Sequence, residues 1–71
     1  MVLIDEIVSE LNDAKAKFPP FNSYHEGYAV IFEEMDELWA EIKGNTAPEF
    51  VRKEAIQVAA MALRFLTDCF E

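Results

Sequence analysis

Apolar residues recur at steps of three and four positions along three stretches of the chain, which is the spacing of helices that bury one side. The first stretch runs from Val2 to Lys17, and its acidic side chains fall on the side opposite the apolar ones. The Pro19-Pro20 pair must end it, because proline has no backbone donor and the residue before a proline avoids the helical region. We therefore expect a first helix over residues 2–17.

A second helix is signalled by its two ends. Ser23 and Glu26 have the spacing of a capping box, in which the serine hydroxyl accepts from a free backbone N–H and the glutamate reaches back toward the cap residue. Gly44 is suited to the left-handed position that follows the end of a helix. These signals predict a second helix over residues 24–43.

The third helix follows after a short connection. Thr46 and Glu49 repeat the capping-box spacing, and Pro48 stands in the first turn, where its missing donor does no harm. A third helix is expected over residues 47–70. Because the connection is short, the second and third helices should lie side by side in opposite directions. The pattern predicts an all-α fold, a three-helix antiparallel unit that forms one domain over residues 1–71.

The chain is short for its apolar content. With 71 residues it can build only one small core, yet 52% of its residues are hydrophobic. Its single cysteine, Cys69, excludes a disulfide framework within the chain. Part of the apolar surface is therefore expected to meet another copy, so that the unit assembles into a dimeric or tetrameric helical bundle.

The charge is strongly acidic. The 14 acidic and 6 basic side chains give a formal net charge of −8, which argues against duplex nucleic acid or an anionic membrane as a direct partner. The chain has no long apolar stretch free of charge that would predict a membrane span. Asp5 and Glu6 stand where a secretory signal would carry basic residues. We expect a cytoplasmic location, and an anionic ligand would need a cation to mediate its binding.

Glutamates form one stripe along the predicted second helix. At 100° per residue they fall within an arc of about 100°, apart from the apolar side. The stripe consists of Glu26, Glu33, Glu34, Glu37 and Glu41. Like charges three and four residues apart destabilise an isolated helix. The arrangement indicates either a solvated face of an acidic protein or a site that binds a cation.

Glu54 is the residue of the third helix that could complete a cation-binding site with this stripe. It lies among apolar residues of the predicted third helix, where a buried carboxylate must be paired, protonated or bound to a metal. One interpretation is that Glu54 reaches solvent or pairs with a lysine or arginine. The other is that it faces Glu34 and Glu37 across the antiparallel pair. Three carboxylates from two helices would make an oxygen-only site that suits Mg²⁺ and also Mn²⁺.

The segment Glu33-Glu34-Met35-Asp36-Glu37 matches the Glu-Glu-x-x-Glu motif of the MazG-like nucleoside triphosphate pyrophosphohydrolases, and Glu54 follows at a spacing within that family's usual range. The stretches 25–43 and 52–66 also resemble small MazG-like proteins. The resemblance implies an all-α, homo-oligomeric bundle lined with Mg²⁺ ligands. It also implies cleavage of an NTP or dNTP to the monophosphate and pyrophosphate, which clears non-standard nucleotides from the pool.

The resemblance assigns roles by position. Glu34, Glu37 and Glu54 would be metal ligands, and Glu33 would be a further ligand or would orient the attacking water, which makes Glu33 and Glu34 the expected catalytic residues. The cations available for the remaining phosphate charge are Lys43, Arg52, Lys53 and Arg64, and the sequence does not choose among them. Lys53 is taken as a candidate substrate-binding residue.

The start of the second helix offers further candidates for substrate binding. Tyr24, with Phe18 and Phe21, would form a surface on which a base stacks, or the two phenylalanines would simply close the end of the bundle. His25 has no second histidine at a metal-binding spacing, so it is either a surface residue or a substrate contact. Tyr24 and His25 are therefore expected beside Lys53 in the substrate site.

One position departs from the family pattern. The second motif of the family is Glu-x-x-Asp, whereas this chain has Glu54-Ala55-Ile56-Gln57. An amide oxygen can coordinate Mg²⁺, so Gln57 is expected to be the fourth ligand, although the lost charge weakens binding. The departure also favours an alternative, a catalytically weakened MazG-like module that binds nucleotide or another protein. A third interpretation is that the protein is only a helical oligomer with an acidic surface.

Overall fold

The computed structural model describes all 71 residues and contains three α-helices and no strand. Helix α1 spans Val2–Lys17, α2 spans Tyr24–Lys43 and α3 spans Pro48–Phe70. The all-α, three-helix prediction is confirmed, and the third helix begins at Pro48 instead of residue 47. None of the three helices has the length and apolar character needed to cross a bilayer.

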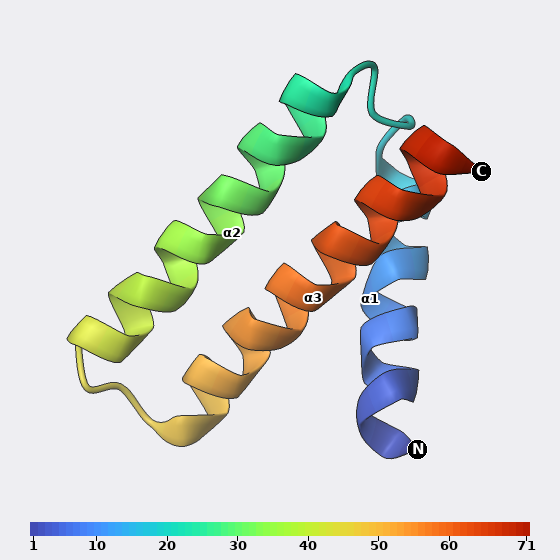
Figure 1. Cartoon of the computed structure of the whole chain (residues 1–71). Helices are drawn as coiled ribbons and strands as arrows, with labels where there is room; N and C mark the ends of the chain where they lie inside the picture. The colour runs from blue at the N-terminus through green and yellow to red at the C-terminus, as the bar shows by residue number, and fades with distance from the viewer.

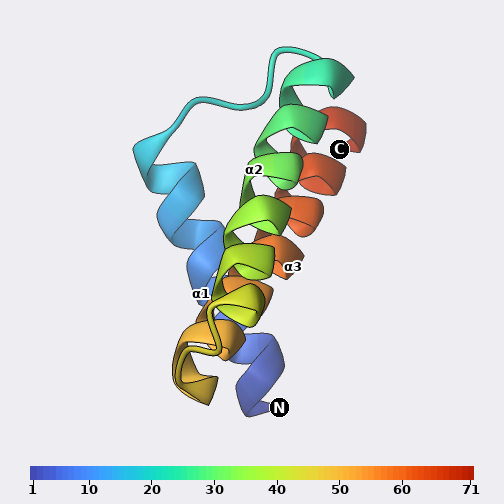
Figure 2. The same cartoon turned by 90° about the vertical axis from the view of Figure 1, so that its left-hand side faces the viewer.

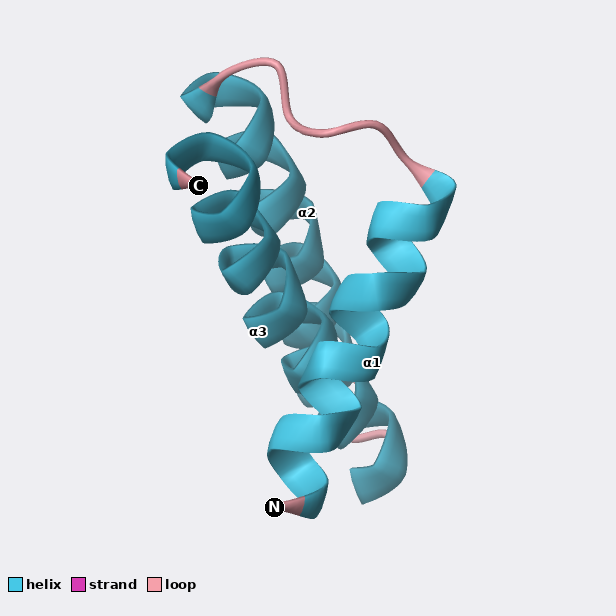
Figure 3. Cartoon of the chain, turned by 90° about the vertical axis from the view of Figure 1, so that its right-hand side faces the viewer, coloured by secondary structure: helices cyan, strands magenta, loops and turns pink.

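The helices α2 and α3 form an antiparallel pair, and α1 packs against α3 (Figure 1). Gly27 allows the pair to approach closely, because a Cβ at this position would overlap the ring of Phe65 on α3. The backbones of α1 and α2 do not approach each other in the same way. Figures 2 and 3 show α1 diverging from the α2–α3 pair toward the loop that joins α1 to α2.

The core is small and lies where the three helices meet. It is built on Ala14 of α1 and on Ala60 and Met61 of α3, with partly buried side chains around them from α1 and α2. Only 8 of the 71 residues are buried within one chain. So small a core leaves most of the apolar side chains in contact with solvent.

Arg64 and Asp68 hold the loop between α1 and α2 against the C-terminal end of α3. Arg64 is 5% exposed, and its Nη2 donates to the carbonyl oxygen of Pro19 at 2.9 Å. Its guanidinium lies 4.0 Å from the ring centroid of Phe21. Asp68 accepts from the Nε of Arg64 and from the backbone N–H of Phe21, and it pairs with Lys15. Arg64 is thus buried between α3 and the loop, and Phe21 closes the end of the bundle.

The first predicted helix cap is present. The hydroxyl of Ser23 accepts from the backbone N–H of Glu26 at 3.1 Å. The reciprocal contact differs, because the Glu26 carboxylate accepts from the backbone N–H of Asn22 at 2.9 Å. The glutamate therefore stabilises the residue before the cap.

The connection between α2 and α3 corrects two predictions. Gly44 keeps a helical φ of −77°, and Asn45 takes the left-handed position with φ 51°. Asparagine tolerates this region better than most residues. The second capping box is also wrong, because the Thr46 hydroxyl donates to the carbonyl oxygen of Glu41, and Ala47 occupies the cap position without a side-chain contact.

A broad apolar surface is left uncovered on the side of the α2–α3 pair that faces away from α1. At 100° per residue, Met35 lies about 160° around α2 from Glu37, which faces α1. We define the outer face by six side chains that are each 46% to 64% exposed: Tyr28, Phe32, Met35, Trp39, Ile42 and Leu66. Leu66 of α3 is 55% exposed, so the outer face extends from α2 onto the third helix.

Candidate metal centre

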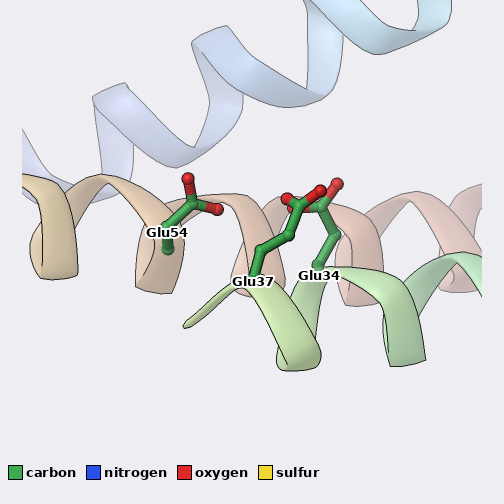
Figure 4. A group of neighbouring side chains, drawn as sticks. All are labelled: Glu34, Glu37 and Glu54. Atoms are coloured by element: carbon green, nitrogen blue, oxygen red, sulfur yellow. The ribbon is translucent and has the colours of Figure 1, made fainter. Parts of the chain in front are cut away.

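Three carboxylates from two helices meet on the side of the α2–α3 pair that faces α1. Glu34, Glu37 and Glu54 each place one carboxylate oxygen within 4.8 Å of the others. Figure 4 shows Glu34 and Glu37 extending from α2 and Glu54 extending from α3. The three-residue spacing puts the first two on one side of α2, and the antiparallel packing brings Glu54 opposite them. We call these three residues the carboxylate trio.

Two oxygens of the carboxylate trio lack any partner. The Oε2 atoms of Glu34 and Glu54 are buried, and no group of the protein donates a hydrogen bond to them. None of the three side chains takes part in an ion pair. Burying a charged oxygen without a partner is costly. The structure therefore shows no lysine or arginine ion pair for Glu54 and leaves one buried oxygen without a partner on each of Glu34 and Glu54.

Burial and neighbouring negative charges act on two carboxylates of the trio. The pKa of Glu34 rises to about 7, first because the group is buried and then because the charges of Glu37, Glu54 and Glu33 lie nearby. Burial and the charge of Glu37 also raise the pKa of Glu54, an effect that Lys53 opposes. Near neutral pH, a proton or a cation in the trio relieves this repulsion.

The residues of the trio fit a hard divalent cation. All available ligand atoms are carboxylate oxygens, which Mg²⁺ and Mn²⁺ prefer, and no histidine or cysteine is present to select a softer metal. The partnerless Oε2 atoms are the ones that gain most from a bound ion. Glu34, Glu37 and Glu54 are thus the residues that could hold it.

We expect the metal-free protein to lose stability as the pH rises. Because the pKa of Glu34 goes from 4.5 to about 7 on folding, its contribution is fully present below 4.5 and is lost through about 7. The raised pKa of Glu54 acts in the same direction. Thermal unfolding with EDTA between about pH 5 and about pH 8 measures the effect.

The same measurement has a matched control. The Glu34→Gln/Glu54→Gln variant should show a smaller loss of stability with rising pH, and Mn²⁺ should stabilise the wild type more at high pH than at low pH. An identical pH dependence in the wild type and the double variant would contradict the assigned protonation of the trio.

A groove of about 550 Å³ runs between α1 and α2 and has α3 as its floor. Glu34 lines this groove and also belongs to the carboxylate trio, so the two features adjoin. Along α1 the groove extends from Glu10 to Lys17, about 10 Å at 1.5 Å per residue. Its far end is formed by Phe18 and neighbouring loop residues. The volume lies within the range of small-molecule sites.

The groove contains two more of the expected site residues. Glu33 is exposed and lines the groove beside Glu34. Gln57 lines the floor, and its Nε2 donates to the Oε2 of Glu10 at 2.7 Å. The amide nitrogen is therefore occupied by a residue of α1.

Lys53 lies next to the trio but outside the groove. Its positive charge acts on Glu54, and it lines a smaller hollow with Glu49 and the ion pair between Arg52 and Glu6. Lys53 forms no ion pair of its own. Of the four expected cations, Arg52 pairs with Glu6 and Arg64 is buried against the loop, whereas the charge of Lys53 acts on Glu54 of the trio.

The structure does not bring Tyr24 and His25 to the carboxylates. Tyr24 lies ten residues before Glu34, which is about 15 Å along α2. Its ring stacks on Phe70 with centroids 5.4 Å apart, and it also meets Phe65. His25 is exposed in the first turn of α2. Their assignment to the substrate site gains no support from this geometry.

No protein-family model, curated protein or solved structure matches this chain. The geometry of the trio and of the groove is thus what bears on function.

The groove wall on α1 was not predicted. Glu10, Asp13 and Lys17 line it. Their only signal in the sequence is that they share the polar side of the first helix, and this spacing alone does not say what that side faces. The packing of α1 on α3 decides it.

Proposed function

We propose that this protein is a Mg²⁺-dependent nucleotide pyrophosphohydrolase of the MazG-like type, which cleaves an NTP or dNTP to the monophosphate and pyrophosphate and so serves to clear the nucleotide pool. One observation carries the proposal. Glu34, Glu37 and Glu54 converge within 4.8 Å from two helices, and two of their oxygens are desolvated without a partner. The adjoining groove offers room for the nucleotide.

The charge of the groove supports a substrate that arrives with a cation. Besides Glu34, four carboxylates line its walls, those of Glu10, Asp13, Glu26 and Glu33, against the cations of Lys17 and Arg64. A free polyphosphate would be repelled by this surface. A divalent ion held by the trio supplies the attraction that the side chains lack, which favours phosphate chemistry through a metal over direct phosphate binding.

When bound, Mg²⁺ neutralises the phosphates and the charge that develops on the leaving pyrophosphate. The chain contributes the remaining parts. Glu34, Glu37 and Glu54 would hold the ion, and its charge would relieve the repulsion that raises the pKa of Glu34 and of Glu54. Glu33 is exposed beside them and can accept a hydrogen bond from a water to orient it for in-line attack. Lys53 contacts a phosphate.

A panel of NTPs and dNTPs, assayed for pyrophosphate with Mg²⁺ or Mn²⁺, tests the proposal. We expect release from at least one nucleotide and none with EDTA. Release of orthophosphate alone, or no turnover of any nucleotide, would contradict it. If Mn²⁺ and nucleotide still raise the melting temperature of a protein that turns nothing over, the weakened binding module is the better description.

We infer that a second copy of the chain covers the outer face. Six large apolar side chains on this face are about half exposed, whereas only 8 residues are buried within the chain. A surface of this kind is characteristic of an interface. Pairing two outer faces would place the α2–α3 pairs of two copies in one four-helix bundle. The trio lies on the opposite side of the α2–α3 pair from the outer face. The trio of each copy would therefore stay accessible to nucleotide in the dimer.

A further inference from the structure

The contact between Gln57 and Glu10 links the groove floor to the groove wall. Gln57 Nε2 donates to Glu10 Oε2 at 2.7 Å, and the contact is partly buried between α3 and α1. Both side chains line the groove together with Glu33 and Glu34. Gln57 also lies one turn after Glu54 on α3, which places it beside the trio.

The chemistry of the two groups determines how the amide is turned. An ionised carboxylate only accepts hydrogen bonds, so it must face the NH₂ of Gln57 and not the carbonyl oxygen. The amide is planar, and its oxygen is on the branch opposite the nitrogen. No protein group donates to Gln57 Oε1. Glu10 thus accepts from one N–H of the amide and fixes which side the NH₂ faces, and it leaves the acceptor Oε1 without a donor from the protein.

We propose that Glu10 is a positioning residue, which orients the Gln57 amide so that its Oε1 serves the divalent ion of the carboxylate trio, directly or through a bound water. The inference rests on the proposed function. The contact explains how a neutral amide can act at this position, because without Glu10 the ion itself would have to turn the amide and fix its oxygen toward the site. Partners that orient metal ligands in this way are worth about 10–100-fold in metal affinity.

Mn²⁺ binding to the full-length chain, measured by calorimetry without nucleotide, tests the inference. Glu10→Gln keeps the size of the side chain but can donate as well as accept, so it no longer selects one amide orientation. We expect it to weaken Mn²⁺ binding about 10-fold. The exchanged variant Glu10→Gln/Gln57→Glu restores the hydrogen bond with the donor on α1, and it should bind Mn²⁺ at least as tightly as the wild type.

Asp13→Asn is the matched control, because Asp13 lines the same groove from the same helix but makes no contact with Gln57. It should change Mn²⁺ affinity much less than Glu10→Gln. An equal loss in both single variants would show that only the net charge matters. No recovery in the exchanged variant, which has the net charge of the wild type, would show that the hydrogen bond between residues 10 and 57 does not govern Mn²⁺ binding. Either result would overturn the role of Glu10. If the wild type binds Mn²⁺ and Glu10→Gln binds it equally well, this inference alone fails. If the wild type binds no Mn²⁺, the proposed function fails with it.

Discussion

Replacing Glu34 by glutamine should abolish Mg²⁺-dependent pyrophosphate release and at the same time stabilise the metal-free protein. The loss should exceed about 100-fold, because even the partners of metal ligands are worth about 10–100-fold. The gain in stability follows because burial and the charges of Glu37 and Glu54 destabilise the ionised Glu34 carboxylate. Steady-state turnover and the melting temperature in EDTA measure the two effects.

The opposite signs of the two effects separate a site residue from a folding defect. Asp36→Asn is the matched control, because Asp36 is an exposed acidic residue of α2 that lies about 160° around the helix from Glu34. It removes the same charge and should leave turnover nearly unchanged. Full activity in Glu34→Gln, or an equal loss in Asp36→Asn, would remove Glu34 from the site.

A glutamate in place of Phe32 should dissociate the expected oligomer. Phe32 lies within the outer face and is 52% exposed in a single chain. Its replacement would bury a charge against apolar side chains of the second copy. We expect the dissociation constant to rise about 30-fold or more, which corresponds to about 2 kcal/mol and to the level of an interface hot spot. Light scattering coupled to size exclusion, over a range of concentrations, measures the change.

Phe50→Glu provides the comparison. Phe50 is also 52% exposed, but it lies about 160° around α3 from Leu66 of the outer face. The variant should keep the oligomeric state of the wild type. A monomeric wild type would contradict the expected assembly, and dissociation caused by Phe50→Glu alone would place the interface elsewhere.

The local signals in the sequence were sufficient for the helices, and they gave the trio as one of two interpretations of Glu54. Pro19-Pro20 and Ser23 delimit α1 and α2 through strong backbone preferences, and the observed bounds agree with the predicted ones. The trio followed from angular position, because the antiparallel neighbours α2 and α3 have few ways to pack. At the second connection the local signal was ambiguous, since both Gly44 and Asn45 tolerate a positive φ.

Features that depend on α1 could not be predicted in this way. The sequence shows which side of α1 is apolar, but not which groove of the α2–α3 pair receives it. Gln57 was therefore expected only as a ligand, without its contact to Glu10, and Arg64 was expected to be a free cation instead of a buried contact of the loop. Both outcomes arise from long-range packing between residues more than 40 positions apart.

Diffraction from a crystal soaked with Mn²⁺ and a non-hydrolysable nucleoside triphosphate, recorded at the manganese absorption edge, tests the role of the carboxylate trio most directly. The proposed function predicts an anomalous peak bounded by carboxylate oxygens of Glu34, Glu37 and Glu54, with the triphosphate reaching it from the groove between α1 and α2. A peak elsewhere with the trio unbound, or nucleotide bound without any ion at the trio, would contradict it.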